Sequence, residues 1–415
     1  MMEKEEMNEH KIQDDGTPQN GPAARPEKAA GEKSGPKKIL LLGATGSIGK
    51  QTLDVIDQHP EDFVLTAVSA GHDQKGLEEI MASHPSVTMA GLSSLEKDEW
   101  KEGIQWLGGE DQMARLAQTA DYDLMVNAVV GFRGLAPTLA AIERQKDLAL
   151  ANKESLVCGG ELVARALQNS ASAIYPVDSE HSAIYQCLQG SDPSEIRRLI
   201  ITASGGSLRD LGRDELEEIT PERALKHPSW KMGARITIDS ATMVNKGFEV
   251  IEAHYLFNVP YSQIATVLHP QSIVHSMVEY QDNAIIAQLG SADMRLPIQY
   301  ALYAGQRPVL HEDHSLDLTR TLSLDFKEMD FERYPMLKTA IEAGRRKGNA
   351  GCILNAADEQ AVAMFLAGEI AFLDIEKAIQ SALESIPFVE DPTFEELKQT
   401  DRKTREFVRQ KAWQA

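Results

Sequence analysis

The stretch KKILLLGATGSIG, residues 37–49, decides the fold of this chain. Its apolar first half predicts a short buried strand, and the glycines that follow it predict a tight turn. Residues 50–58 have helical spacing, with Leu53 and Ile56 on one side. A strand, a glycine turn and a helix in this order open a dinucleotide-binding βαβ unit, because backbone N–H groups at the helix start can face a pyrophosphate. A turn that needs glycine only for packing is the alternative interpretation.

Three different patterns follow one another along the chain. Strand signals at 63–69, 88–92, 124–127 and 148–150 alternate with helical patterns, which favours a doubly wound parallel sheet. The signals at 198–202, 265–268, 273–280 and 284–289 indicate an α+β part, and the last two are close enough for a hairpin. Residues 334–409 show mainly helical periods.

We therefore expect an α/β protein in several parts. The expected parts are a disordered tail (1–36), a Rossmann-like dinucleotide-binding domain (37–178), an α+β catalytic domain (179–299), a linker (300–325) and a C-terminal α-helical bundle (326–415). The tail is polar and lacks the apolar core of a secretory signal.

Composition narrows the class of protein. The chain has 415 residues, of which 42% are hydrophobic and 25% charged, as in soluble proteins of two or three domains. A net charge of −21 argues against nucleic-acid binding, and no apolar stretch is long enough to span a membrane. Three widely spaced cysteines favour a reducing cytoplasm over a disulfide or zinc framework.

Two polar segments suggest a metal site. Asp178 and Glu180 are two residues apart, so an extended segment would point both carboxylates to one side. If residues 245–249 are helical, Asn245, Lys246 and Glu249 share one face. Three carboxylates with amide and ammonium groups would suit a hard divalent cation and an anionic substrate. Ordinary charges at a strand end and on a helix surface remain the alternative interpretation.

Other polar segments follow predicted strands or form loops. Residues 151–155 (ANKES) stand where open α/β sheets place ligand groups, although a helix cap has the same look. Residues 202–207 (TASGGS) offer hydroxyl and N–H groups to a phosphate, or form a plain turn. Residues 227–233 (HPSWKMG) predict a mobile lid with a tryptophan. His275 lies in a strand pattern and is predicted to be structural.

Seven ordered blocks carry a family resemblance. They are GATGSIG (43–49), ANKESLV (151–157), PVDSEHSAIYQ (176–186), ASGGS (203–207), HPSWKMG (227–233), DSATMVNKGFEVIEA (239–253) and HPQSIVHSMV (269–278). From residue 37 onward the chain resembles the 1-deoxy-D-xylulose 5-phosphate reductoisomerases of non-mevalonate isoprenoid biosynthesis. The resemblance implies isomerisation and NADPH-dependent reduction of that phosphorylated keto-sugar to 2-C-methyl-D-erythritol 4-phosphate. It also implies a divalent metal (Mg²⁺, Mn²⁺ or Co²⁺) and a homodimer.

The resemblance also assigns roles to residues. The metal ligands fall on Asp178, Glu180 and Glu249, which with Lys153 form the expected catalytic set. Substrate-binding positions fall on Ser179, Glu180, Ser204, His227, Trp230, Met232, Ser240, Asn245, Lys246 and Glu249. Cofactor-binding positions fall on Thr45, Gly46, Ser47, Ile48, Gly71, His72, Asp73, Asn152, Lys153, Glu154 and Gly233.

Two segments depart from the family pattern, one at residues 70–73 and one at residues 355–359. His72 and Asp73 stand where the family usually has a basic or small residue and then Asn, and a carboxylate there would repel the 2′-phosphate of NADPH. Ser69 occupies the usual ribose-binding acidic position, which favours NADPH over NADH. Asp358 replaces a usual Asn.

Two other functions remain as alternatives. One is a semialdehyde-type dehydrogenase with the same glycine turn and a thiolate nucleophile, for which Cys158 is the candidate. The other is a nucleotide-sensing protein that keeps the fold without turnover.

Overall fold

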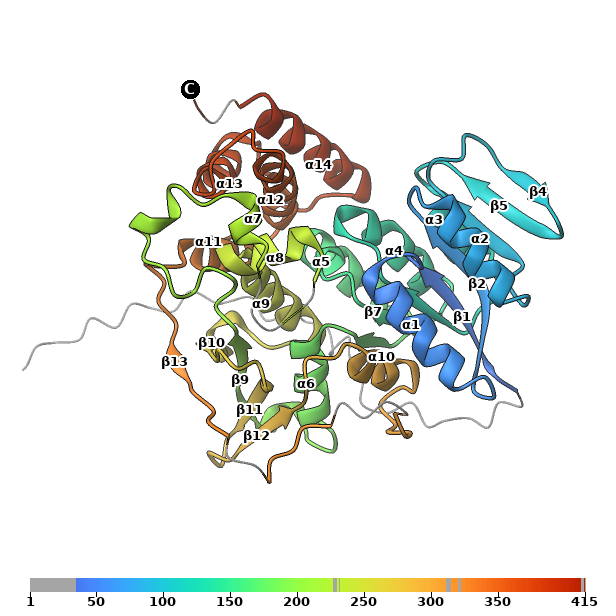
Figure 1. Ribbon diagram of the computed structural model, residues 1–415, viewed down its shortest axis with the longest axis horizontal. Coiled ribbons are helices and arrows are strands. Elements are labelled where there is room, and N and C mark those ends of the chain that lie inside the picture. Colours follow the sequence, from blue (N-terminus) through green and yellow to red (C-terminus); the bar gives the residue numbers. More distant parts are fainter. Residues whose placement is uncertain are drawn as a thin grey trace, which may run out of the picture.

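The computed structural model describes residues 35–226, 230, 232–310, 315–319, 322–411 and 414 (Figure 1). Most of the expected N-terminal tail and His227 therefore lie outside the described residues. Among the residues that are described, no helix is both long and apolar enough to cross a membrane.

The N-terminal part is an eight-stranded sheet in the order β4-β5-β3-β2-β1-β6-β7-β8, parallel except for the pair β4 and β5. Its strands are β1 (Lys37–Leu42), β2 (Phe63–Ala70), β3 (Met89–Leu92), β4 (Glu99–Lys101), β5 (Ile104–Gly108), β6 (Leu124–Asn127), β7 (Asp147–Leu150) and β8 (Ile174–Pro176). Its helices are α1 (Ser47–Gln58), α2 (Gln74–Ser83), α3 (Gln112–Thr119), the 3-10 turn η1 (Gly131–Gly134), α4 (Leu135–Glu143) and α5 (Glu154–Gln168). The doubly wound sheet is confirmed; β4, β5 and β8 were not predicted.

Strand β1 lies at the centre of this sheet, between β2 and β6. Ile39 to Leu42 are fully buried, which is why this strand is uniformly apolar rather than alternating. The turn after it needs glycine at two positions. Gly43 has φ +78°, and a Cβ there would lie 2.5 Å from the Ala128 carbonyl oxygen, while a Cβ on Gly49 would lie 2.3 Å from that of Gly43.

The second sheet has the order β12-β11-β9-β10-β13 and is mixed. Its strands are β9 (Ile196–Ala203), β10 (Ile264–Leu268), β11 (Val274–Tyr280), β12 (Ile285–Leu289) and β13 (Lys327–Glu328). Helices α6 (Ser179–Cys187) and α9 (Val244–Phe257) pack against it, and α8 (Ala234–Thr242) precedes α9. The predicted α+β part is therefore present, with α10 (Arg295–Leu302) reaching back to α1.

The C-terminal part is helical, as predicted, and packs on both other parts (Figure 1). Its helices are α11 (Pro335–Arg346), α12 (Ala350–Leu366), α13 (Asp374–Ser385) and α14 (Phe394–Arg409). The almost wholly buried α12 contacts α13, α14 and α5, and α11 contacts α9. In the described part of 303–326, there is no helix or strand.

The carboxyl ends of both sheets supply the polar loops. Strand β8 ends at Pro176 and α6 begins at Ser179, so Asp178 lies at the joint between them. Strand β9 ends at Ala203, directly before Ser204. Ligands of open α/β sheets bind at such strand ends, so the fold predicts a ligand site at this edge.

Candidate active site

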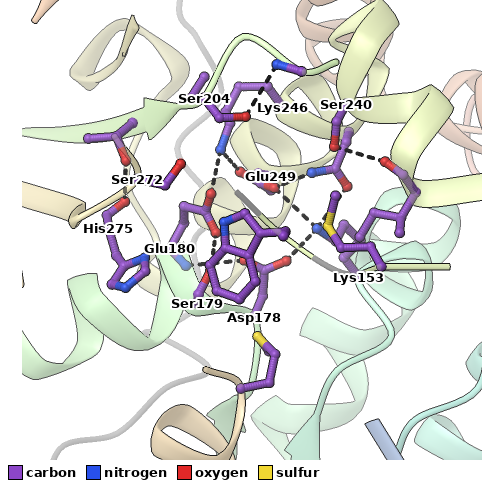
Figure 2. A pocket seen from close by; sticks show the side chains of 18 of the residues that line it. Lys153, Asp178, Ser179, Glu180, Ser204, Ser240, Lys246, Glu249, Ser272 and His275 are labelled. Carbon is purple, nitrogen blue, oxygen red and sulfur yellow. Dashed lines mark hydrogen bonds and ion pairs between the residues drawn. The ribbon is translucent and has the colours of Figure 1, made fainter. Parts of the chain in front are cut away.

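A cavity of about 210 Å³ opens where the strand ends and α8 and α9 meet (Figure 2). Fourteen of the candidate residues line it: Ser47, Ile48, Lys153, Asp178, Ser179, Glu180, Ser204, Trp230, Met232, Gly233, Ser240, Asn245, Lys246 and Glu249. The structure thus brings together side chains that are separated by up to about 200 positions in the chain, and it places the glycine turn beside the carboxylates.

The three carboxylates come from two helices. The prediction of an extended segment at Asp178 and Glu180 is wrong: Asp178 is the N-cap of α6, and its Oδ1 accepts the N–H of Glu180 at 3.2 Å. A carboxylate at this position satisfies a free helical N–H, which an extended chain would not offer. Glu249 lies on α9, which is helical as predicted. One oxygen from each carboxylate lies within 4.8 Å of the others.

Two ammonium groups lie among these carboxylates. Lys153 pairs with Asp178 and, at 3.2 Å, with Glu249, and Lys246 pairs with Glu249 and, at 2.9 Å, with Glu180. Lys153 also donates to Asn245 Oδ1 at 3.0 Å. The lysines and Glu249 are nearly fully buried, so three negative charges face two positive charges in a dry environment. An all-oxygen donor set with a net negative charge fits a hard divalent cation.

The pKa values reflect the same charge arrangement. Burial alone would lower the pKa of Lys153, but Asp178 and Glu249 raise it well above its usual value. Burial would raise the pKa of Asp178, but Lys153 and His181 hold it well below its usual range. For Glu249, burial and the neighbouring Glu180 raise the pKa against the effect of the lysines. The ammonium groups are therefore charged, and at Glu249 the two lysines do not fully offset burial and the neighbouring carboxylates.

A second set of possible metal ligands, Asp178, His181 and Glu252, lies beside the first and shares Asp178 with it. The Nε2 atom of His181 faces the carbonyl oxygen of Glu249 at 2.8 Å, and Nδ1 faces a carboxylate oxygen of Glu252 at 3.2 Å. The Nε2 atom therefore donates to a backbone carbonyl, whereas Nδ1 lies within ion-pair distance of two carboxylates but has no hydrogen-bond partner among the described residues. Glu252 and Asp178 raise the pKa of His181 to about 9 against the lowering effect of burial.

The remaining wall of the cavity is rich in hydroxyl groups and lies at the end of β9. Gly205 and Gly206 both have positive φ, and the N–H of Gly206 donates to Ser204 Oγ at 3.2 Å. Sequence reasoning missed Ser272 and treated His275 as structural, yet both line the cavity. The ring of Trp230 lies 6.0 Å from that of His275. The block at 269–278 was the only signal for these two residues.

The predicted cofactor residues are not all in one place. Ser47, Ile48 and Gly233 line the cavity, and Thr45 and Gly46 precede them in the same turn. His72 and Asp73 lie at the end of β2 and are exposed. The Asp73 carboxylate accepts the N–H of Gly76 at 3.0 Å and caps α2, so it is directed into the helix start.

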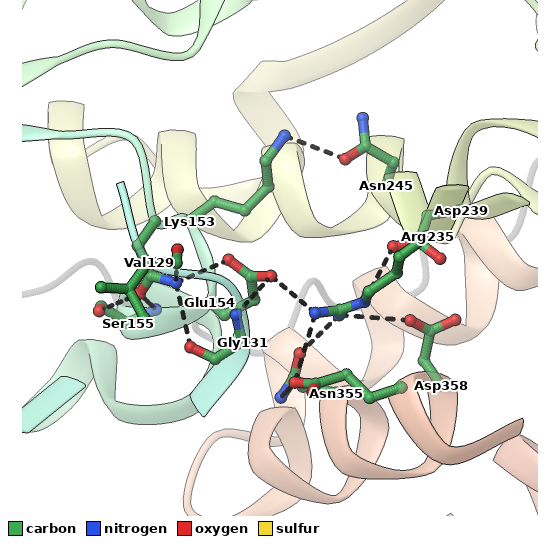
Figure 3. A network of polar contacts seen from close by, with 12 residues as sticks. Val129, Gly131, Lys153, Glu154, Ser155, Arg235, Asp239, Asn245, Asn355 and Asp358 are labelled. Atoms are coloured by element: carbon green, nitrogen blue, oxygen red, sulfur yellow. Dashed lines mark hydrogen bonds and ion pairs between the residues drawn. The ribbon is translucent and has the colours of Figure 1, made fainter. Parts of the chain in front are cut away.

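Asn152 and Glu154 lie behind the cavity wall instead of in it. The Asn152 amide donates to the carbonyl oxygens of Val129 and Gly131, at 2.9 and 3.0 Å. Glu154 accepts from the N–H of Gly131 at 3.0 Å and pairs with Arg235 at 2.9 Å (Figure 3). Sequence reasoning did not identify Arg235, and no local pattern marks it.

Family models match most of the chain. The model described as 1-deoxy-D-xylulose 5-phosphate reductoisomerase matches residues 39–160, and the model of that enzyme's C-terminal domain matches residues 174–257. A further model, described as the DXP reductoisomerase C-terminal domain, matches residues 289–407.

Individual relatives carry the same name. The protein of Geobacillus sp. (strain WCH70) is 48% identical over 377 residues, which cover 90% of this chain and 99% of the relative. That of Bacillus subtilis (strain 168) is 48% identical over 90% of this chain and 98% of its own length.

Solved structures agree with the fold. A crystal structure of DOX-P reductoisomerase in complex with NADPH, fosmidomycin and magnesium is 35% identical, with a TM-score of 0.84 over 90% of this chain and 98% of that one. The Zymomonas mobilis enzyme in complex with NADPH is 38% identical, with a TM-score of 0.80 over 89% and 97% of the two chains.

Proposed function

The chain belongs to the 1-deoxy-D-xylulose 5-phosphate reductoisomerase family, and on that premise we propose that its cavity isomerises and reduces 1-deoxy-D-xylulose 5-phosphate. The product is 2-C-methyl-D-erythritol 4-phosphate, an intermediate of non-mevalonate isoprenoid biosynthesis. The chain is an NADP-dependent oxidoreductase that uses NADPH and a divalent metal. The observation that carries the proposal is the three-carboxylate cluster in the same cavity as Ser47 and Ile48 of the glycine turn.

Each wall of the cavity has a proposed task. Asp178, Glu180 and Glu249 hold a divalent cation, which when bound supplies Lewis acidity to the substrate oxygens. Lys153 donates hydrogen bonds and can move a proton at Nζ beside those oxygens. The substrate phosphate is held by Ser204, Ser240, Asn245 and Lys246. The Lys246 ammonium and the hydrogen-bond donors of the others attract this anion, which the net charge of −21 of the whole chain would otherwise repel.

The other walls present the hydride donor and exclude water. The turn at Ser47 and Ile48 binds the NADPH phosphates, so that the nicotinamide can reach the same cavity as the substrate. Trp230 and Met232 line this cavity and, with His227, belong to the proposed lid. A closed lid would keep water from a reactive aldehyde and strengthen the electrostatic interactions inside.

The environment of Cys158 argues against the alternative function, a semialdehyde-type dehydrogenase with a thiolate nucleophile. Cys158 is 2% exposed and does not line the cavity, and burial raises its thiol pKa well above the usual value. A thiol in that environment is not a nucleophile. Alkylating agents should therefore leave the activity unchanged. The nucleotide-sensing alternative predicts NADPH binding without turnover.

The proposed function is tested by NADPH absorbance. With 1-deoxy-D-xylulose 5-phosphate and Mg²⁺ we expect NADPH consumption, and a chelator should abolish it until Mg²⁺ or Mn²⁺ is restored, because the carboxylates then have no cation to present. NADH in place of NADPH serves as the control for cofactor choice. Consumption that ignores the chelator, or no consumption at all, contradicts the proposal.

We also propose that the chain forms a homodimer and acts in the cytoplasm. Ile285 and Ile286, on edge strand β12, are 54% and 47% exposed, as expected of a contact surface. The three cysteines are buried and free, as suits a reducing compartment. Light scattering should give a mass near twice 45.7 kDa, and a monomer mass at micromolar concentration contradicts the dimer.

A further inference from the structure

One partly buried arginine, Arg235, joins all three parts of the fold (Figure 3). Arg235 is the second residue of α8 and stands two positions after the proposed lid (227–233). Its guanidinium lies within 3.5 Å of four carboxylates, those of Glu154, Asp239, Asp358 and Glu359. It also donates to the amide oxygen of Asn355 at 3.1 Å. The planar fork of arginine allows contacts in several directions at once, which a lysine ammonium cannot reproduce.

On the dinucleotide side, Arg235 acts on the loop that carries Lys153. Its Nη1 donates to Glu154 Oε1, which also accepts the N–H of Gly131. The other oxygen of Glu154 accepts the amide of Asn152 at 3.0 Å. Glu154 is thus held by donors from the loops after β6 and β7 and from α8. Lys153, the residue before it, points to the opposite side and reaches Asn245 (Figure 3).

On the C-terminal side, α12 fixes the orientation of the guanidinium. Asn355 and Asp358 lie one turn apart on this helix and both are fully buried. The Glu359 carboxylate is shared with Arg405 of α14, at 3.0 Å. The Arg235 side chain has contacts on three sides and therefore little rotamer freedom. The position of α12 thus determines where the guanidinium lies, and the guanidinium determines where the Glu154 carboxylate lies.

The cluster also has an excess of negative charge. Burial and the neighbouring Asp358 raise the pKa of Asp239, and burial raises the pKa of Asp358 to about 7 against the effect of Arg235. Among the described residues, Oδ1 of each of these two carboxyls has no hydrogen-bond partner. Arg235 therefore has two separable effects, the balance of charge and the fixed geometry around Glu154.

We propose that Arg235 is a positioning residue: through Glu154 it fixes the loop that carries Asn152 and Lys153, with α12 as its support. This inference rests on the proposed function and adds a residue that touches neither substrate nor cofactor. The loop lies against both the proposed NADPH positions and the carboxylate cluster. A loosened loop should weaken the binding of NADPH and also misplace the Lys153 ammonium.

The test separates geometry from charge. Arg235→Gln should lower kcat by on the order of a hundredfold, since a misplacement of about 1 Å has that cost. The Kd of NADPH, measured by its fluorescence without metal or substrate, should rise roughly tenfold, the size seen when supporting partners of ligand-binding groups are removed. Arg235→Lys keeps the cation but not the planar fork, so it should restore Tm but recover only a small part of the losses in kcat and NADPH affinity.

A double variant removes the charge argument. Arg235→Gln combined with Asp358→Asn restores the charge balance of the cluster and should recover thermal stability, while kcat and the NADPH Kd stay impaired. Recovery of kcat in this double variant would show that Arg235 only balances charge, and the proposal would be overturned. Because the double variant carries no extra buried charge, it gives the measurement even where the single variant does not fold.

A matched control lies elsewhere in the chain. Arg213 pairs with Glu376 of α13 at 3.1 Å and so also joins the middle of the chain to the C-terminal helices. Arg213→Gln should lower Tm but leave kcat and the NADPH Kd unchanged. Equal effects of the Arg213 and Arg235 variants on kcat contradict the inference. If the wild type consumes no NADPH with this substrate, the proposed function fails, and the Kd series still tests Arg235.

Discussion

The variant Glu249→Gln is expected to lose about 10³-fold or more in kcat/KM. A bound metal supplies several kcal/mol of charge stabilisation in the transition state, and each 1.4 kcal/mol corresponds to a factor of ten. Glu249 is the most buried of the three carboxylates and contacts both lysines, so glutamine removes the charge at the centre of the cluster. The side-chain volume hardly changes, so the cavity keeps its shape.

The measurement should separate metal binding from folding. Titration with Mn²⁺ should show a Kd raised by at least about tenfold, the lower end of the range for lost partners at metal sites. The circular dichroism spectrum should be unchanged and Tm not lowered, because glutamine removes an incompletely compensated buried charge. Glu252→Gln is the matched control, since Glu252 is also buried on α9 but pairs with His181. Wild-type Mn²⁺ affinity in Glu249→Gln would remove Glu249 from the site.

The second large effect is expected for Lys153→Met. This variant should lose activity, but unlike Glu249→Gln it should not lose affinity for Mn²⁺. Loss of the ammonium group should lower kcat by about 10²–10³-fold, as for other groups aimed at developing charge in a dry site. Asp178 and Glu249 would lose a competing cation, so Mn²⁺ should bind as tightly as before or more tightly. Single-turnover NADPH oxidation at saturating Mn²⁺ gives the rate. If Mn²⁺ affinity falls together with kcat, Lys153 supports the metal site and does not act on the substrate.

Much of the fold could be predicted from local patterns of apolar and polar residues in the sequence. The apolar run before Gly43 predicted a short buried strand, and the structure has it at the centre of the sheet. Strand β4 was missed because Glu99, Trp100 and Lys101 are all exposed and show no apolar alternation. A strand without a buried face leaves no trace in a hydrophobicity pattern.

The residues of the candidate site could be predicted from the sequence for a different reason. Asp178 and Glu180 were identified although their backbone was assigned wrongly, because residue type and the family blocks pointed to them independently of secondary structure. Arg235 shows the opposite case. Its partners Glu154 and Asp358 lie about 80 and 120 positions away, and each residue alone looks like an ordinary helix charge. Only the packing of α12 against α5 and α8 brings these charges together.

The joint between β8 and α6 has a consequence for the choice of substrate. Strand β8 is hydrogen-bonded into the dinucleotide-binding sheet, α6 packs on the second sheet, and only Val177 and Asp178 separate them. So short a connection allows hardly any change in the spacing between the glycine turn and the carboxylates. The distance between the bound cofactor and the metal ligands would therefore be fixed, and the substrate would have to match it in length. Sugars with one carbon more or fewer between the chelating oxygens and the hydride-accepting carbon would be rejected by their length.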